Sequence, residues 1–377
     1  MNLIPQNGIY RVGTQTFTEK IPALRYASQT KEQVTWDYGD KYFSMLDWSY
    51  EPPETLSELY EERCRQLRDK YDYLVLYFSG GSDSHNMVTH FQRAGVHIDE
   101  IVSYWPIEYF NSKKPATDST KGTEIQNEWF HTAKPALEKL KKELPNTKIT
   151  IRDTTRFILE QSTNIDVDEW IKIAGEHISI DIAGTSIERY TTGHMLQLYD
   201  KKYVGHIHGI DKPRVFRVDG EWYFAFLDSV LGLPPTLESN DLKGVYAEVE
   251  HFYWNLDSAR LLVKQAHAIK NFFESNPQYN PPSNRGLNFA ERQQYDRFVR
   301  DIVYPFWHHG FQIDKPQSVF FCEVGDWALN ESEAVNHHWH EIYEAVTGSI
   351  DSRFLQSKPG SKVYDSFCGF WSKWHKI

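Results

Sequence analysis

The stretch Tyr73-Leu74-Val75-Leu76-Tyr77-Phe78-Ser79-Gly80-Gly81-Ser82-Asp83-Ser84 decides the fold. Its first half, residues 73–78, is a continuous apolar run of strand length, which is typical of a strand that helices cover in a parallel sheet. Its second half is a glycine turn flanked by serines, after which apolar residues recur at helical spacing until Gly95. A strand, a tight turn and a helix in this order predict one unit of an α/β fold.

The segments on either side continue the alternation of helices and strands. Thr55-x-x-Glu58 has the spacing of a capping box and predicts a helix that runs to about Lys70. Downstream, residues 101–105 and 148–151 have the pattern of strands, and an amphipathic helix is predicted between them over roughly residues 124–144. The resulting βαβαβ order predicts a doubly wound parallel sheet.

The second half of the chain is predicted to be more mixed. Residues 203–209 predict a further strand, and the alternation over residues 214–226 around Asp219-Gly220 predicts a β-hairpin. Leu233-Pro234-Pro235 marks a boundary, after which the sequence predicts mostly helix. The longest of these predicted helices covers residues 246–273.

Composition limits the class of protein. The chain has 377 residues, 40% of them hydrophobic and 15% aromatic, which predicts a folded globular protein. No run approaches the roughly 18 apolar residues of a membrane span, so we expect a soluble, cytoplasmic protein without membrane contacts. The formal net charge of −11 argues against a broad surface for duplex nucleic acid. Cys64, Cys322 and Cys368 are too few and too scattered for a disulfide scaffold or a zinc site of four thiolates.

The glycine turn has the features of a phosphate-binding loop. Gly80 and Gly81 let the backbone turn sharply and approach an anion without an intervening Cβ. The next amides begin a helix, where unpaired N–H groups and the positive end of the helix dipole favour phosphate. Three hydroxyl groups add further donors, those of Ser79, Ser82 and Ser84. Asp83 cannot itself attract a polyphosphate, and we expect it to hold Mg²⁺, which bridges carboxylate and phosphate oxygens.

Other known phosphate loops do not match. The sequence contains no G-x-x-x-x-G-K-[ST] pattern of a Walker A loop, and no G-x-G-x-x-G dinucleotide fingerprint follows this strand. A structural alternative stays open, in which the glycines only turn the chain and Ser82 or Asp83 caps the helix. The position of the whole hexapeptide between a buried strand and a helix favours the phosphate loop.

The hexapeptide is similar to SGGxDS, the signature of the PP-loop ATP pyrophosphatases, a superfamily that includes asparagine synthetase, NAD synthetase, GMP synthetase and PAPS reductase. The matching positions are Ser79, Gly80, Gly81, Asp83 and Ser84. The general resemblance covers residues 54–230, and the rest of the chain looks similar to PP-loop proteins of large tailed phages. The resemblance implies an adenine nucleotide alpha hydrolase-like, Rossmann-like fold.

The resemblance further implies an enzyme that uses ATP and Mg²⁺ and cleaves ATP to AMP and pyrophosphate. A carboxylate or carbonyl oxygen of the substrate would attack the α-phosphorus, and an amine or ammonia would then displace AMP. Because the leaving pyrophosphate is negatively charged, we expect a lysine or arginine to reach it from elsewhere in the fold. The substrate is expected to be a small molecule or a nucleobase, and an acceptor within nucleic acid stays open.

Residues 208–214 are the candidates for that charge, because their position resembles a later strand-end loop of asparagine synthetase-like members. By this resemblance Lys212 would contact pyrophosphate and Arg214 would assist it. Asp211 would share the metal, and Gly209 would line the nucleotide site. The alternative is that this segment simply leads into a hairpin and carries solvated charges.

Tyr104 and Trp105 end the second predicted strand, where the superfamily usually seats adenine. They are equally well explained as core aromatics. His251 and His267, on the predicted long helix, are candidates either for a substrate pocket or for structural histidines. These alternatives cannot be separated by the pattern alone.

Two other groups suggest different chemistry. Cys368 supports a second hypothesis, a PAPS reductase-like or sulfur-transfer enzyme, but Phe367 stands where the reductase motif has a glutamate. His308-His309 and His337-His338-x-His340 are potential zinc ligands, yet neither group has an HExxH pattern. A third hypothesis is a non-catalytic protein that only binds ATP.

The patterns and the resemblance together predict three parts. Residues 1–53 would be an N-terminal extension, and residues 54–232 the PP-loop ATP-binding domain. Residues 233–377 would be a mostly helical region that binds the substrate or acceptor.

Overall fold

Helices and strands alternate along the chain in the computed structural model, which places the protein in the α/β class. The structure describes residues 8–112, 128–164, 166–168, 177–178, 203–209, 214–228, 246–279, 299–306, 322–357 and 365–377. None of the helices within these ranges is both long enough and apolar enough to cross a membrane.

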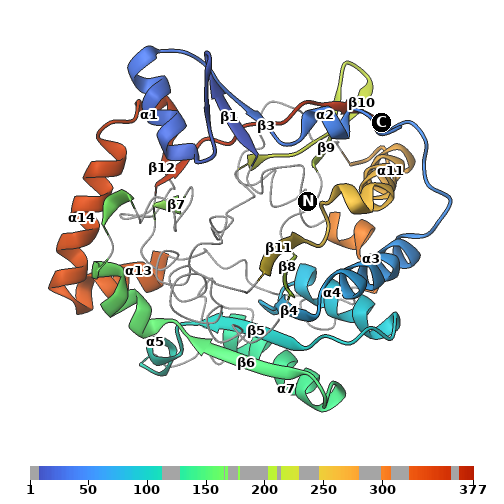
Figure 1. The fold of residues 1–377 in the computed structure, drawn as a ribbon, viewed down its shortest axis with the longest axis horizontal. Coiled ribbons are helices and arrows are strands. Elements are labelled where there is room, and N and C mark those ends of the chain that lie inside the picture. The colour runs from blue at the N-terminus through green and yellow to red at the C-terminus, as the bar shows by residue number, and fades with distance from the viewer. Residues whose placement is uncertain are drawn as a thin grey trace.

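A five-stranded parallel sheet occupies the lower part of Figure 1, with the strand order β11-β8-β4-β5-β6. Every neighbouring pair in it is parallel. The strands are β4 (Tyr73–Tyr77), β5 (Glu100–Trp105), β6 (Lys148–Asp153), β8 (Tyr203–His208) and β11 (Tyr246–His251). The first four were predicted from the sequence and are confirmed. Because β4 is the middle strand, the loop that follows it lies at the centre of the sheet's carboxyl edge.

Side chains alternate between the two faces of β4, as the strand period requires. Leu74 and Leu76 pack into the large core, whereas Val75 and Tyr77 belong to a second, smaller cluster. Each of the four is at most 8% exposed. Burial on both faces explains why this strand is a continuous apolar run rather than an alternating one.

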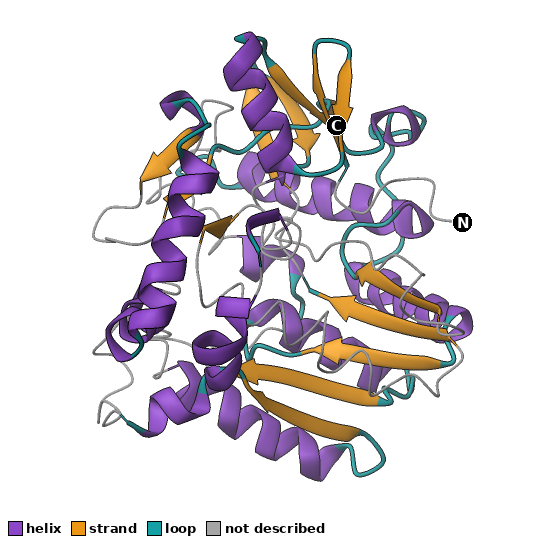
Figure 2. Ribbon diagram, turned by 60° about the vertical axis from the view of Figure 1, so that its left-hand side comes forward, coloured by secondary structure: helices purple, strands orange, loops and turns teal. Residues whose placement is uncertain are grey.

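Helices cover the face of the sheet that carries the large core (Figure 2). They are α3 (Leu56–Lys70), α4 (Ser82–Arg93) and α7 (Lys134–Glu143). The predicted capping box begins α3, because the Thr55 side chain accepts from the Glu58 N–H and the Glu58 carboxylate accepts from the Thr55 N–H. A π-helical turn, η1 (Trp129–Ala133), precedes α7 directly.

The N-terminal segment folds into an antiparallel sheet of its own, with the order β2-β1-β3. Its elements are β1 (Ile9–Val12), β2 (Gln15–Phe17), α1 (Lys20–Thr30), β3 (Val34–Asp37) and the short α2 (Asp40–Phe43). This sheet is attached to distant parts of the chain. The buried Lys20 Nζ lies 3.0 Å from Asp228 Oδ2, and Arg25 donates to the Ala345 carbonyl at 2.8 Å.

The predicted hairpin is confirmed as β9 (Arg214–Val218) and β10 (Glu221–Ala225). Its two turn residues, Asp219 and Gly220, have φ values of 50° and 87°, as a type I′ turn requires. The C-terminal strand β14 (His375–Lys376) pairs with β10, so the end of the chain completes this small sheet.

The prediction of one helix over residues 246–273 is wrong in its first part. Residues 246–251 form β11, and the helix α11 covers only Ala259–Ser275. The cause is tertiary, because β11 pairs with β8 and buries Glu250 against Arg63 of α3 at 2.7 Å. A buried glutamate with a distant partner has no local signature in the sequence.

The rest of the described C-terminal region contains further helices and short strands. Its helices are α13 (Cys322–Glu331) and α14 (Glu333–Thr347), at the left of Figure 1. A third small sheet joins β7 (His177–Ile178), β12 (Leu355–Ser357) and β13 (Asp365–Phe367). Short helical segments complete the list: α5 (Ile107–Asn111), η2 (Phe157–Gln161), η3 (Ser162–Asn164), η6 (Leu256–Ser258) and η8 (Ser352–Phe354).

Candidate functional site

The glycine turn leaves the middle strand of the sheet and enters α4 within four residues. Gly80 has a φ of 76°, a conformation that side chains other than glycine rarely adopt. A Cβ at this position would lie 2.7 Å from the Cα of Ala133 in η1. Gly80 is therefore required twice, by its backbone conformation and by the close approach of η1.

Among the residues that the structure describes, no side chain caps the start of α4. Gly81 is the N-cap residue, in an extended conformation, and it has no side chain with which to accept from the first helical amides. The serines bond elsewhere: Ser79 Oγ accepts from the Gly81 N–H at 3.3 Å, and Ser84 Oγ donates to the Gly81 carbonyl at 3.0 Å. The structural alternative in which Ser82 or Asp83 caps this helix is thus not the observed geometry.

The end of the neighbouring strand β8 meets this helix start. A Cβ on Gly209 would lie 3.4 Å from the carbonyl carbon of Asp83 and 2.8 Å from Cε of Met87. The loop after β4 and the end of β8 are therefore in contact, as expected for adjacent parallel strands. Gly209 therefore lies beside the loop, and its contact with a nucleotide stays a prediction.

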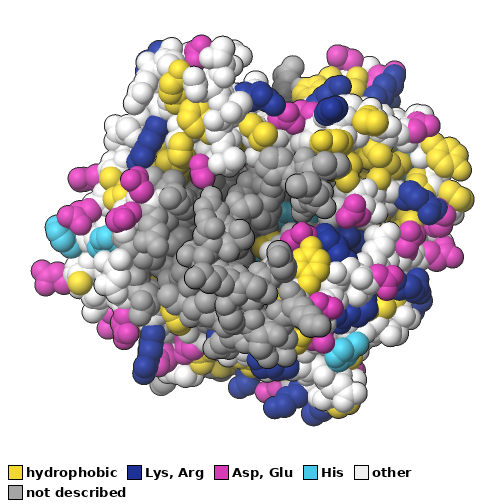
Figure 3. Space-filling model, viewed as in Figure 1, with side chains coloured by type: hydrophobic (Ala, Val, Ile, Leu, Met, Phe, Trp, Pro, Cys, Tyr) yellow, Lys and Arg dark blue, Asp and Glu magenta, His cyan; other side chains and the backbone are white. Residues whose placement is uncertain are grey.

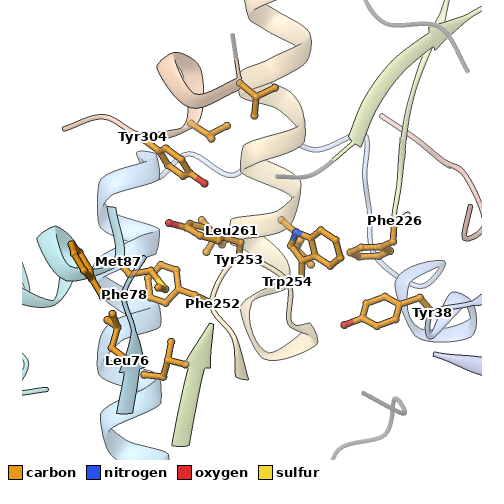
Figure 4. Packing of buried hydrophobic residues seen from close by; sticks show 14 of the residues in the cluster. Tyr38, Leu76, Phe78, Met87, Phe226, Phe252, Tyr253, Trp254, Leu261 and Tyr304 are labelled. Carbon is orange, nitrogen blue, oxygen red and sulfur yellow. The ribbon is translucent and has the colours of Figure 1, made fainter. Parts of the chain in front are cut away.

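Asp83 is half-buried and bonded to two tyrosines from other parts of the chain. The Tyr304 hydroxyl donates to Asp83 Oδ1, and the Tyr253 hydroxyl donates to the Asp83 main-chain oxygen at 2.7 Å. Figure 4 shows the Tyr253 and Tyr304 rings side by side near the helix that carries Met87. Burial, followed by the Asp83 charge, raises the pKa of Tyr304 well above its ordinary value, so this hydroxyl keeps its proton at neutral pH.

A group of rings lies on the sheet face opposite α4, at the carboxyl ends of β4, β5 and β8. The rings of Tyr77 and His208 are stacked with centroids 4.0 Å apart, and the Tyr77 hydroxyl shares a hydrogen bond of 2.9 Å with His206 Nδ1. Tyr104 stacks beside Tyr77 at 6.0 Å and is half-exposed. This face combines flat rings with polar groups, which suits a heteroaromatic ligand.

Trp105 has a different environment from Tyr104. It is 5% exposed, packs against Trp129 at 5.5 Å, and donates its ring N–H to Ser103 Oγ at 2.7 Å. A fully packed and hydrogen-bonded indole of this kind is a core residue. Of the two aromatic candidates, Trp105 is buried and Tyr104 is half-buried.

The later strand-end loop is described only at its two ends. Arg214 is buried as the first residue of β9, at 3% exposure, and His208 ends β8. Lys212 and Asp211 lie outside the described residues, so their proposed contacts with pyrophosphate and metal stay predictions.

The other candidate residues are dispersed. Cys368 is half-buried, and its N–H donates to the Phe354 carbonyl at 2.9 Å. Figure 3 shows acidic and histidine side chains along the edge where Figure 1 places α14. There His337 and His338 approach one carboxylate, that of Glu341, at 3.5 and 3.8 Å. His308-His309 lies outside the described residues.

The two histidines that were predicted on one long helix lie in different elements. His251 ends β11 and is 5% exposed, and burial lowers its pKa to about 4. His267 lies in α11, where its Nε2 shares a hydrogen bond of 2.9 Å with the Trp48 carbonyl. The contact of His267 favours the structural interpretation.

The donor set suits a metal that arrives with a nucleotide. Within the described residues, no group of three or more His, Cys, Asp or Glu side chains is arranged to hold a metal ion. Mg²⁺ needs few protein ligands when phosphate oxygens and waters complete its shell, and one or two carboxylates are usual. Asp83 fits that requirement and does not form part of a closed protein cage.

Sequence reasoning missed Tyr253, Tyr304 and His206. Tyr253 and Tyr304 are separated from Asp83 by 170 and 221 residues. His206 was predicted only as part of a strand, and its partner Tyr77 as a core residue. The one available signal was the pair His206 and His208, because two histidines at alternate positions are unusual in a buried strand.

Comparison with known proteins gives no relative: no protein-family model matches the chain, and no curated protein is significantly similar to it.

Proposed function

We propose that residues 79–84 bind the polyphosphate of ATP and that the protein cleaves ATP to AMP and pyrophosphate. The observation that carries the proposal is the hexapeptide at the carboxyl end of the middle parallel strand, opening a helix that no side chain of the described residues caps. Uncapped amides at a helix start donate hydrogen bonds to anions, and ligands of open α/β sheets bind at the carboxyl edge of the sheet. The five parallel strands and the helices on their face are compatible with a doubly wound, Rossmann-like fold of the PP-loop type.

The residues of the loop would act mainly by electrostatics. The amides of residues 82–84 would hold the leaving pyrophosphate, and the hydroxyl of the exposed Ser79 would add a donor. Asp83 would hold Mg²⁺, which when bound neutralises charge on the phosphate oxygens. Lys212 and Arg214 are the proposed further cations. The adenylated group would be a carboxylate or carbonyl oxygen, and an amine or ammonia the second nucleophile.

The ring group on the opposite face is the proposed seat of the base. Tyr104 is half-buried and lies next to the buried Tyr77, which stacks on the buried His208 at 4.0 Å. Flat rings of this kind bind adenine or an aromatic substrate by stacking. With this assignment the base and the phosphates lie at the same carboxyl edge of the sheet, on opposite faces of β4.

A second candidate function, binding of ATP without turnover, is favoured by one contact. Tyr304 occupies Asp83 Oδ1 in the structure, so one carboxylate oxygen is already bonded before any ligand arrives. A protein that only senses ATP would need the loop amides but not a fully available carboxylate.

Product analysis separates the two candidates. The protein is incubated with ATP, Mg²⁺ and pools of carboxylic acids and amines, and the nucleotides are separated by chromatography. Formation of AMP and pyrophosphate in equal amounts, abolished in Asp83→Asn, supports the ligase. Tight ATP binding without turnover supports the sensor, and release of ADP contradicts cleavage at the α-phosphorus.

A further inference from the structure

Two hydrogen bonds from remote segments converge on Asp83. One comes from Tyr304 to the carboxylate, and the other from Tyr253 to the main-chain oxygen at 2.7 Å. Tyr304 belongs to the short described segment 299–306, and Tyr253 follows β11. The conformation of the loop residue therefore depends on parts of the chain outside the βα unit that contains it.

Both tyrosines are themselves fixed by their surroundings. They are 2% and 1% exposed, and their ring centroids are 5.5 Å apart. Asn86 Nδ2 donates to the Tyr253 hydroxyl at 3.0 Å, and the Tyr60 hydroxyl donates to the Val303 carbonyl at 2.9 Å, next to Tyr304. Neither hydroxyl can move without breaking contacts with α3 or α4, so both are oriented before a ligand binds.

From this geometry, and resting on the proposed function, we propose that Tyr304 is a positioning residue that holds the Asp83 carboxylate in one orientation for the metal–nucleotide complex. A hydrogen bond to an ionised oxygen is stronger than one between neutral groups, so it restrains a side chain that would otherwise rotate. Groups that hold metal ligands in place commonly change metal affinity by tenfold or more when they are removed. Tyr253 donates to the main-chain oxygen of Asp83 and not to its carboxylate, so it does not share this role.

The chain offers a matched pair of variants. Tyr304→Phe removes the hydroxyl that bonds to the carboxylate, whereas Tyr253→Phe removes a neighbouring buried hydroxyl that bonds to the main chain. Both lose one oxygen from the same cluster and keep the ring. Tyr253→Phe also removes the acceptor of Asn86 Nδ2, so a general loss of packing and polar contacts would affect it at least as much as Tyr304→Phe, and a larger effect of Tyr304→Phe on the carboxylate indicates positioning.

The first measurement needs no ligand. Urea unfolding of wild type, Tyr304→Phe, Asp83→Asn and the double variant gives the coupling between the two side chains. We expect a coupling of about tenfold in the unfolding equilibrium constant, and less than about twofold in the same cycle with Tyr253→Phe. Additive effects of Tyr304→Phe and Asp83→Asn would overturn the inference.

The second measurement is the Mg²⁺ concentration that gives half-maximal ATP binding, which is determined by calorimetry at a fixed ATP concentration. Tyr304→Phe is expected to need about tenfold more Mg²⁺ for half-maximal effect, and Tyr253→Phe to stay within about twofold of wild type. If wild type responds to Mg²⁺ and Tyr304→Phe responds identically, this inference alone is overturned. If wild type binds no ATP, the proposed function fails, and the metal role of Tyr304 fails with it.

Discussion

Arg63 of α3 and Glu250 of β11 form an ion pair of 2.7 Å in which each side chain is only 1% exposed. Lys70 and Asn255 also donate to the Glu250 carboxylate, each at 2.7 Å. The pair attaches the edge strand to the helix that precedes β4. Because Tyr253 follows that strand by two residues, this buried pair also fixes the segment that contacts Asp83.

Removal of the charge at Glu250 is expected to be strongly destabilising. Glu250→Gln leaves the Arg63 guanidinium buried without a counter-charge, which typically costs about 3–5 kcal/mol. Glu248→Gln is the matched control, since Glu248 lies two residues away in the same strand and also bonds to Lys70, but its side chain is 30% exposed. Urea unfolding at pH 7 checks the difference. Equal losses for the two variants would contradict the importance of burial.

The same pair predicts an acid-sensitive stability. Burial alone would raise the pKa of Glu250, but the charges of Arg63 and Lys70 outweigh it and hold the pKa at about 2. The unfolded carboxyl titrates near 4.5. The folded state therefore keeps this contribution above pH 4.5 and loses it as the pH falls toward 2, by about 3 kcal/mol. Unfolding of wild type and Glu250→Gln from pH 6 to pH 2.5 should show the two curves converging at acid pH.

His90 predicts a second pH effect, in a higher range. It lies between Tyr60 and Phe306, and neither ring nitrogen has a hydrogen-bond partner in the part of the chain that the structure describes. Burial, with a smaller effect of Arg93, lowers its pKa to about 4. The unfolded state therefore takes up a proton first as the pH falls from 6.5 to 4, and stability decreases by up to about 3 kcal/mol.

His90→Phe should remove that part of the pH dependence. The phenyl ring fits among the aromatic neighbours and carries no unpaired polar atom, so the cost at pH 7 is expected to be below about 1 kcal/mol. At pH 4.5 the variant should be more stable than wild type in urea unfolding. His337→Phe, at a side chain that is 78% exposed, is the control and should follow the wild-type curve. If His90→Phe kept the pH dependence of wild type, the assignment of this effect to His90 would be contradicted.

Gly80→Ala tests the close approach of η1 to the loop. Both Gly80 and Gly95 have positive φ, at 76° and 65°, but a Cβ at Gly80 would meet Ala133, whereas a Cβ at Gly95 would meet no described residue within 4 Å. Gly95→Ala should cost about 1 kcal/mol for the backbone conformation alone. Gly80→Ala should cost about 2–4 kcal/mol, because a clash with Ala133 is added. Similar unfolding midpoints for the two variants would show that η1 does not press on the loop.

The sequence was informative wherever structure follows from neighbouring residues. The apolar run at residues 73–78, the Thr55–Glu58 capping box and the Asp219-Gly220 turn each specify an element by local chemistry, and each is found as predicted. The hexapeptide at residues 79–84 also specified its own position between strand and helix. Local patterns thus predicted four of the five parallel strands and the loop.

Contacts between distant residues could not be predicted in this way. The strand at residues 246–251 was predicted as a helix, because the residue that allows Glu250 to be buried there, Arg63, lies 187 residues earlier in the sequence. Trp105 and Tyr104 are adjacent and similar in sequence terms, yet they lie on opposite faces of β5, and Trp105 is buried whereas Tyr104 is only partly buried. The hydrogen bonds from Tyr253 and Tyr304 to Asp83 depend on the same kind of long-range packing.

The most direct test of the central claim is a pyrophosphate titration of the protein labelled with ¹⁵N-glycine, followed by the amide resonances. Pyrophosphate is the part of ATP that the loop is proposed to hold, and its use requires no knowledge of the second substrate. We predict the largest shifts at Gly80 and Gly81, with Gly95 and Gly220 unchanged. Binding of pyrophosphate that leaves the Gly80 and Gly81 resonances in place would contradict the account.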